Sequence, residues 1–261
     1  MLETSTLTQE QARRRADWSW LIKILYRPRK TLAAVLQSER AVWLPALLAL
    51  SLAAVLLVVS NGIIRQKIGL GNPAQLPEYF EYYSPEQQQQ FMQALDATSG
   101  AAFVFVLPAM ASLVKVWLGW LIVGSLVYLS LTAVGSGIKS RTALNVVAWA
   151  SIPLALRDLV RAIAVLASSQ LIQAPGLSGF TSAAPGNSGL FINALLTLID
   201  AYWIWQVVLI NLGAASAGKA TVKKTVAAVT FTMLIILLLQ AGIGFGMLLL
   251  GSKVSAFQVF L

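Results

Sequence analysis

The chain has 261 residues, of which 57% are hydrophobic and only 11% are charged. Soluble domains carry roughly a quarter charged residues, so this composition excludes a soluble core and indicates a membrane protein. The sequence contains no Cys and no His, which excludes disulfides, thiolate nucleophiles, histidine bases and the usual zinc and haem ligand sets. The net charge of +9 does not indicate nucleic-acid binding, because the Lys and Arg residues lie in short loops between apolar runs.

The first segment is basic and aromatic. Within residues 18–42, Pro28 suits the first turn of a helix, and Leu32, Val35 and Leu36 recur at helical spacing, so we expect a short helix at the membrane interface. Its charges either contact anionic headgroups, enforce topology, or meet a protein partner. The residues expected to contact the lipid surface are Trp18, Trp20, Lys23, Arg27, Arg29 and Lys30.

Five apolar stretches follow. The first has no charge between Arg40 and Arg65, and about 24 residues of helix would be roughly 36 Å long, enough to cross a ~30 Å hydrocarbon core. The second is too long for one crossing and is divided at Pro108; the third contains Pro153, where we expect a kink that also shapes helix packing. The predicted spans are residues 42–64, 110–134, 143–172, 190–212 and 226–250.

Positive charge is unevenly distributed between alternate loops. Thirteen Lys and Arg residues lie on the side of the N-terminus, against three on the other side. Because positive loops stay in the cytoplasm, we predict an all-α, polytopic membrane bundle with five transmembrane helices, a cytoplasmic N-terminus and an external C-terminus. The chain then divides into a basic segment 1–41, a membrane domain 42–251 with an external loop 65–100, and a tail 252–261.

The external loop contains a helix signal of its own. Ser84-Pro85-Glu86-Gln87 matches a capping box, and Phe91, Met92 and Leu95 supply one apolar face, so a helix is predicted over residues 85–97. This helix either docks an extracytoplasmic partner or anchors at the interface beside the bundle.

Charges inside apolar spans each cost about 2.5–3.5 kcal/mol near a helix centre and are normally paired or hydrated. Asp200 lies near the middle of the fourth predicted span, and we expect it to pair with Arg157, with Lys115 and Arg161 as alternatives. A proton or ion relay and contact with a partner subunit are the other interpretations of Asp200.

Glycine spacing and nucleotide-binding motifs give little further information on the function. Gly242 and Gly246 form a G-x-x-x-G in the fifth span, which favours close packing within the chain or, alternatively, a dimer seam. No Walker-type Gly-x-x-x-x-Gly-Lys-[Ser/Thr] run occurs, so the chain is not expected to power transport by itself.

Four features together resemble the Yip family of five-span membrane proteins, in particular its bacterial branch. They are the segment Tyr26-Arg-Pro28-Arg-Lys-Thr-Leu, the run Trp149-Ala-Ser-Ile-Pro153-Leu-Ala-Leu, the run Trp205-Gln-Val-Val-Leu-Ile-Asn-Leu-Gly213, and the lysines before the fifth span. The resemblance implies a multi-pass protein of the bacterial cytoplasmic membrane that accompanies an export system of the ABC (ATP-binding cassette) type.

The sequence therefore predicts a non-enzymatic accessory or assembly subunit of a larger membrane complex, without a cofactor or a metal. Its expected partners are anionic lipids and other membrane subunits. The alternative is a stand-alone small transporter or channel, which would need a continuous polar path. A membrane-embedded lipid-modifying enzyme would normally need His, Cys, a metal site or a pair of acids.

Overall fold

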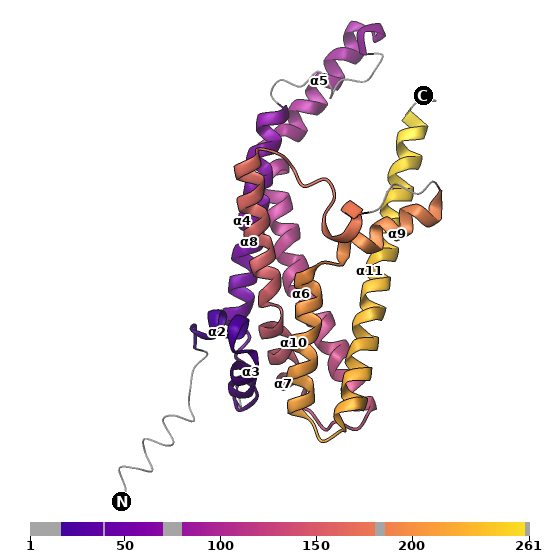
Figure 1. Ribbon diagram of the computed structural model, residues 1–261. Coiled ribbons are helices and arrows are strands. Elements are labelled where there is room, and N and C mark those ends of the chain that lie inside the picture. Colours follow the sequence, from indigo (N-terminus) through magenta and orange to yellow (C-terminus); the bar gives the residue numbers. More distant parts are fainter. Residues whose placement is uncertain (1–16, 39, 70–79, 181–185, 259–261) are drawn as a thin grey trace, which may run out of the picture. The chain divides into compact units, whose positions relative to one another are not determined.

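The computed structural model describes residues 17–38, 40–69, 80–180 and 186–258 (Figure 1). Within these ranges every regular element is helical, which confirms the all-α class. Predicted features of residues 1–16, 70–79 and 259–261 lie outside the described residues. The helices are α2 (Trp20–Tyr26), α3 (Pro28–Leu36), α4 (Leu44–Gly69), α5 (Pro85–Ser99), α6 (Leu107–Ala133), α7 (Ser140–Ala150), α8 (Ile152–Ser168), α9 (Asn187–Leu198), α10 (Ala201–Ala217) and α11 (Val222–Gln258), with short turns η2 (Phe80–Tyr82), η3 (Ala102–Val106) and η4 (Gly176–Phe180).

Three of the helices are long and apolar enough to cross a membrane. They cover Leu44–Lys67, Ala102–Ala133 and Val222–Leu250, and the bent pair α9 and α10 makes a fourth crossing if it is counted as one span. These segments correspond to the first, second, fifth and fourth predicted spans. The third predicted span is divided between α7 and α8, and each of these is too short to qualify as a candidate span.

The chain forms two compact units. One comprises Met1–Ala49, Gly119–Leu154 and Gln173–Leu261; the other comprises Leu50–Leu118 and Ala155–Ile172. The core of the first unit is made by α2, α3, α7, α10 and α11 with the start of α4 and the last turns of α6, around the fully buried Trp149. In the second unit, the Trp117 indole donates to Ser51 Oγ over 3.1 Å, and the Phe105 ring packs directly against Gly62, so α6 and its first turn lie close to α4.

The third predicted span is two helices rather than one kinked helix. The Ser151 amide donates to the Val147 and Ala148 carbonyls and ends α7, and Ile152 then begins α8. Pro153 therefore lies in the first turn of a new helix, where its missing N–H costs nothing, and it does not kink a continuous one. Pro153 itself is buried.

The fourth predicted span is also interrupted. The axes of α9 and α10 meet at 63°, and Figure 1 shows α9 turned out of line with α10 and lying against α11. Gly176, at φ +66°, fills the inside of the bend, because a Cβ there would lie 2.7 Å from the carbonyl oxygens of Leu196 and Ile199. The Leu177 amide donates to the Ile199 carbonyl over 3.0 Å, which satisfies a backbone group that the bend leaves open.

The second predicted span is not divided at Pro108. The Leu107 amide donates to the Ala102 carbonyl five residues back, so η3 is a π-helical turn that leads directly into α6. Widening of the helix before Pro108 accommodates a residue that has no amide hydrogen to donate. The segment from Ala102 is thus continuous with the span rather than a separate interfacial piece.

The predicted starts of two helices are confirmed. Pro28 occupies the first turn of α3, and Ser84 and Gln87 form the predicted capping box at the start of α5. The expected single N-terminal helix is instead two helices, because Arg27 adopts φ −132° and ψ 54° between them.

Candidate functional site

The N-terminal helices pack into the first unit by one face. Trp20 is 8% exposed and meets Trp149 of α7 edge to face, with ring centroids 5.4 Å apart and an interplanar angle of 67°. Ile24, Leu32 and Val35 are also buried in the same cluster. One side of α2 and α3 is therefore part of the protein core, and Trp20, expected at the lipid surface, lies inside it.

A polar junction holds the chain that leads from α3 into α4. The Asn145 amide accepts from the Val42 backbone over 2.9 Å and donates to the Arg40 carbonyl over 2.9 Å. One helical turn further along α7, the Trp149 indole donates to the Val42 carbonyl over 3.0 Å. Because Asn145 and Trp149 lie four residues apart on one helix face, they fix the position at which the first span begins.

Close backbone contact brings α10 against this junction. A Cβ at Gly213 would lie 2.5 Å from Val146 Cγ1, so a side chain there would collide with α7, and it would lie in ordinary van der Waals contact with Leu32 of α3, 3.5 Å away. Further along, the Gln206 amide donates to Ser151 Oγ over 2.8 Å, and the Ser151 hydroxyl donates to the Val147 carbonyl. The hydrogen bond between Gln206 and Ser151 therefore joins α10 to the end of α7.

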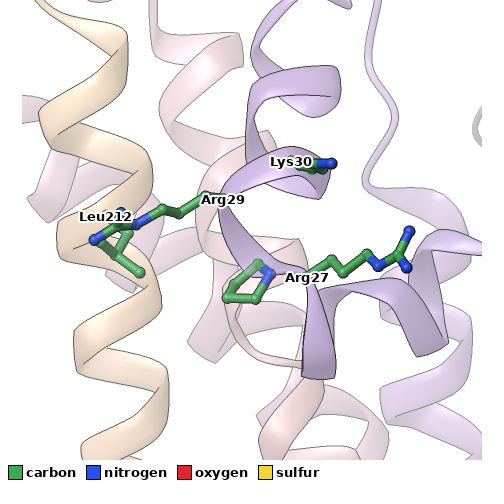
Figure 2. A pocket seen from close by; sticks show the side chains of 5 residues that line it. Arg27, Arg29, Lys30 and Leu212 are labelled. Carbon is green, nitrogen blue, oxygen red and sulfur yellow. The ribbon is translucent and has the colours of Figure 1, made fainter.

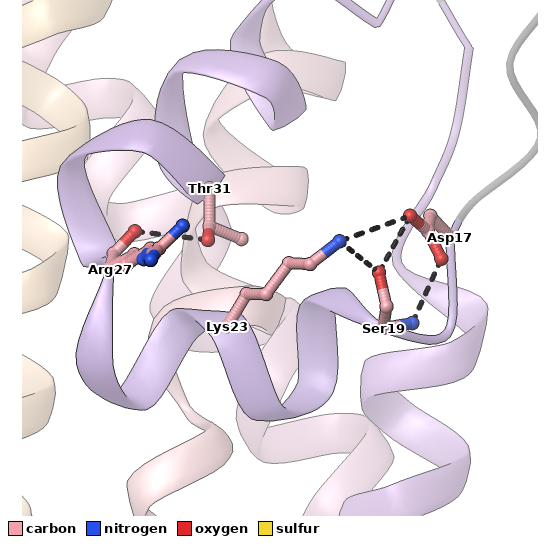
Figure 3. Close-up of polar contacts among 5 residues, drawn as sticks. All are labelled: Asp17, Ser19, Lys23, Arg27 and Thr31. Carbon is pink, nitrogen blue, oxygen red and sulfur yellow. Dashed lines mark hydrogen bonds and ion pairs between the residues drawn. The ribbon is translucent and has the colours of Figure 1, made fainter.

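The exposed side of α2 carries the first predicted surface charge. Lys23 donates to Ser19 Oγ over 2.6 Å and lies 3.8 Å from Asp17 Oδ2, and Ser19 also donates to Asp17 (Figure 3). The charge of Lys23 is therefore balanced by an acid of the same segment.

The other three predicted basic residues surround the start of α3. Arg27, Arg29 and Lys30 are exposed, and in the described part of the chain none of them has an ion pair. Arg27 lies 5.5 Å from the centre of the Tyr26 ring. In Figure 2, Arg29 extends toward Leu212 of α10, whereas Arg27 and Lys30 extend to the opposite side. A recess of about 430 Å³ is lined by Arg27, Pro28, Arg29, Lys30 and Leu212.

The predicted intramembrane charges occupy different settings. Asp200 is the N-cap of α10, and its carboxylate accepts from the Trp203 amide over 2.8 Å. Arg157 donates to the adjacent Asp158 over 3.0 Å, and Arg161 is partly buried on α8. Lys115 is exposed on α6. Pairing of Asp200 with a basic residue stays a prediction.

The glycines of the fifth span face open space. A Cβ added at Gly242 or Gly246 would meet nothing within 4 Å, so neither glycine supports close packing among the residues that the structure describes. The glycines that do permit close approach are Gly62, Gly124, Gly176, Gly213 and Gly218.

The sequence did not single out Asn145 as a functional residue. Its only signal is a polar side chain in an apolar run next to Trp149, and such a residue can equally face water or a loop. Within the described ranges, no group of three or more His, Cys, Asp or Glu side chains is placed to hold a metal ion.

Comparison with known proteins identifies the family. The family model described as the Yip1 domain matches residues 22–244, a range that contains α3, the polar junction on α7, both interrupted spans and most of α11. No curated protein and no solved structure gives a significant match. The match agrees with the resemblance noted in the sequence and with the three or four candidate spans. The chain belongs to the Yip1 domain family and is a multi-pass membrane protein.

Proposed function

We propose that this protein is a non-enzymatic accessory or assembly subunit of a larger complex in the bacterial cytoplasmic membrane, an ABC-type exporter being the first candidate. It crosses the membrane five times, with its N-terminus in the cytoplasm and its C-terminus outside. The observation that carries the proposal is the setting of Lys115 on α6.

The part of α6 around Lys115 packs little within its own unit. None of residues 102–123 is buried, and Lys115 is exposed without an ion pair to any residue that the structure describes. Lys115 lies about 20 Å along the helix from Ala102 and about 27 Å from Ala133, which is close to the midpoint of the candidate span.

A lysine at that depth needs a counter-charge or water. An uncompensated Lys near the centre of a span costs roughly 2.5–3.5 kcal/mol, and intramembrane cations usually pair with an acid or face a polar cavity. A carboxylate on a transmembrane helix of another subunit supplies the missing counter-charge and covers the apolar surface beside it. This argument supports assembly with a partner.

A second surface supports the same function. Tyr82 is 85% exposed and Met92 is also exposed, on a segment braced by ring contacts of Phe80 with Tyr83 and Phe91. Gln88 donates to the carbonyls of Phe80 and Tyr83 and so fastens η2 to α5. Exposed aromatic and Met side chains on an ordered support are common at protein interfaces, so this segment suits contact with a partner's external domain.

Co-purification from native membranes in mild detergent tests the proposal. We expect the wild-type protein and Lys115→Arg to retain the same membrane partner. The amount of this partner that co-purifies with Lys115→Leu should be at least about tenfold lower, because Leu cannot pair with a carboxylate. Lys67→Leu, an exposed lysine at the end of α4, is the control and should retain the partner. Retention by Lys115→Leu together with a higher melting temperature would assign Lys115 to lipid and overturn the proposal.

A stand-alone transporter is the alternative, because helices that are interrupted inside a membrane often surround ion or substrate sites. The bend between α9 and α10 carries the acid Asp200. Two contacts argue against this function. Gly176 packs against the carbonyl oxygens inside the bend, and the Leu177 amide donates to the Ile199 carbonyl. Flux of ions or small solutes through liposomes containing only the purified chain, abolished by Asp200→Asn, would favour the transporter.

A further inference from the structure

The exposed side of α2 carries an apolar stripe. Trp18, Ile22 and Tyr26 recur every four residues and are 59%, 68% and 59% exposed, whereas Trp20 and Ile24 on the other side are buried. Ile22 and Tyr26 lie on one face of α2, and Trp18 lies in the turn that precedes the helix. The segment therefore has two apolar faces: one is used by the core, and the other is uncovered.

Unbalanced positive charge lies at the end of this stripe. Arg27 adjoins the Tyr26 ring, and Arg29 and Lys30 follow in the first turn of α3. That turn contains no acidic residue, and among the described residues the acid that pairs with the segment is Asp17, which lies beside Lys23 (Figure 3). An apolar stripe with Trp and Tyr, bordered by Lys and Arg, is typical of segments that lie in the membrane interface.

The chain holds this face close to a bilayer. Seven residues separate the end of α3 at Leu36 from the start of α4 at Leu44, which begins a candidate span. Seven extended residues reach at most about 25 Å, and the junction at Val42 with Asn145 and Trp149 shortens the path further. The stripe is thus tethered within reach of lipid headgroups.

We propose that α2 and the first turn of α3 form a docking face for an anionic bilayer surface. Trp18, Ile22 and Tyr26 enter the interface, and Arg27, Arg29 and Lys30 bind the phosphate groups of anionic lipids. Arg27 and Lys30 extend to one side of α3 and Arg29 to the other, toward Leu212, so the three cations do not converge on one point as a site for a single free phosphate ion would require (Figure 2). This face is independent of the contact proposed for Lys115.

The full-length protein allows a direct test, because it contains no Cys. A single Cys introduced at Ile22 takes an environment-sensitive fluorophore, and the labelled protein is reconstituted into bilayers of phosphatidylcholine with or without phosphatidylglycerol. We expect the emission to shift to shorter wavelength and the probe to be quenched by lipid-borne quenchers only when phosphatidylglycerol is present. The same label at the exposed Gln37 should stay in water.

Charge variants locate the lipid contact. Each surface Lys or Arg contributes about fivefold to attraction by anionic lipid, so Arg27→Gln/Arg29→Gln/Lys30→Gln should lower the ratio of docked to undocked face by about 100-fold. The matched control removes three other exposed lysines, Lys219→Gln/Lys223→Gln/Lys224→Gln, and should leave docking within about fivefold of the wild-type value.

Other occupants give different results. If the probe at Ile22 stays in water in both bilayers, the proposal is wrong, and an acidic protein is the expected partner of this face. A probe that is buried to the same extent in both bilayers and in detergent overturns it in favour of a second copy of the chain. Equal losses in the two triple variants overturn the assignment to Arg27, Arg29 and Lys30. Competition by 10 mM inorganic phosphate at constant ionic strength would assign the cations to a free anion instead.

Discussion

Helices α6 and α7 follow each other in the chain, and both are apolar, but they are used in opposite ways. In α7, Ala143 and every residue from Asn145 to Ala150 are buried, although the helix has only 11 residues. In α6, which has 27 residues, the buried positions are confined to Gly124, Val127 and Leu131. Most of the short helix is buried in the core of the first unit, whereas the long helix contributes few buried positions.

This difference shows what hydropathy measures in a membrane protein. A long apolar run identifies a segment that tolerates lipid, because lipid tails solvate Leu as well as a protein interior does. Protein–protein packing is recognised by other features, namely polar side chains and small residues at close contacts. Asn145, Trp149 and Gly213 have these features at buried contacts, whereas a Cβ added at Gly119 of α6 would meet nothing within 4 Å.

The largest expected effect is at the centre of α7. Trp149→Ala removes a fully buried ring, its edge contact with Trp20 and its hydrogen bond to Val42, and should lower the free energy of unfolding by about 3–5 kcal/mol. Leu118→Ala on α6, at 52% exposure, should cost under about 1 kcal/mol. Unfolding in mixed micelles measures both changes. Equal losses would remove the distinction between the two helices.

The contact of α10 with α7 should give an intermediate effect. Gly213→Ala forces a Cβ onto Val146 and should destabilise the protein by about 1–3 kcal/mol. Gly242→Ala on α11 meets nothing and should stabilise its helix by about 0.5–1 kcal/mol. The double variant Gly213→Ala/Val146→Ala should lose less stability than the sum of its parts, and strict additivity in melting experiments would show that the two side chains do not collide.

The smallest expected effect is at the interrupted span. If the Asp200 carboxylate acts only as a cap, Asp200→Ala should cost about 1 kcal/mol and Asp200→Asn almost nothing, because Asn caps equally well. If Asp200 also pairs with Arg157, Asp200→Ala should cost about 3–5 kcal/mol, and Arg157→Ala in the same chain should restore part of the loss. Thermal melts of the two single variants and the double variant separate these cases.

Local rules predict the helix starts at Pro28 and Pro85, the all-α class and the approximate positions of the long spans, because each depends on neighbouring residues. The sequence predicts a kink at Pro153 but not the end of α7 just before it. The break at Asp200 was missed because its carboxylate was interpreted as an intramembrane charge and not as the N-cap of a new helix. A backbone hydrogen bond from Leu177 also stabilises the second break, and Leu177 lies outside the sequence of the span.

The exposure of the residues proposed to contact lipid was predicted in part for the same reason. Arg27, Arg29 and Lys30 are exposed, as their charge requires, but the pairing of Lys23 with Asp17 and the burial of Trp20 depend on tertiary structure. The pattern at Gly242 and Gly246 matched a packing motif, yet the glycines that allow close approach match no such motif, because a partner such as Val146 comes from elsewhere in the chain.

The junction of Arg40 and Val42 with α7 has a consequence for how the protein is made. Its hydrogen bonds join residues 103, 105 and 107 positions apart, so α2 and α3 leave the ribosome well before their partners exist. At about 5–20 residues per second, the delay is on the order of 5–20 s. During that time Trp20 and Ile24 have no core to enter. A bilayer surface that holds the segment by its basic and aromatic side would keep it near the insertion site until α7 arrives.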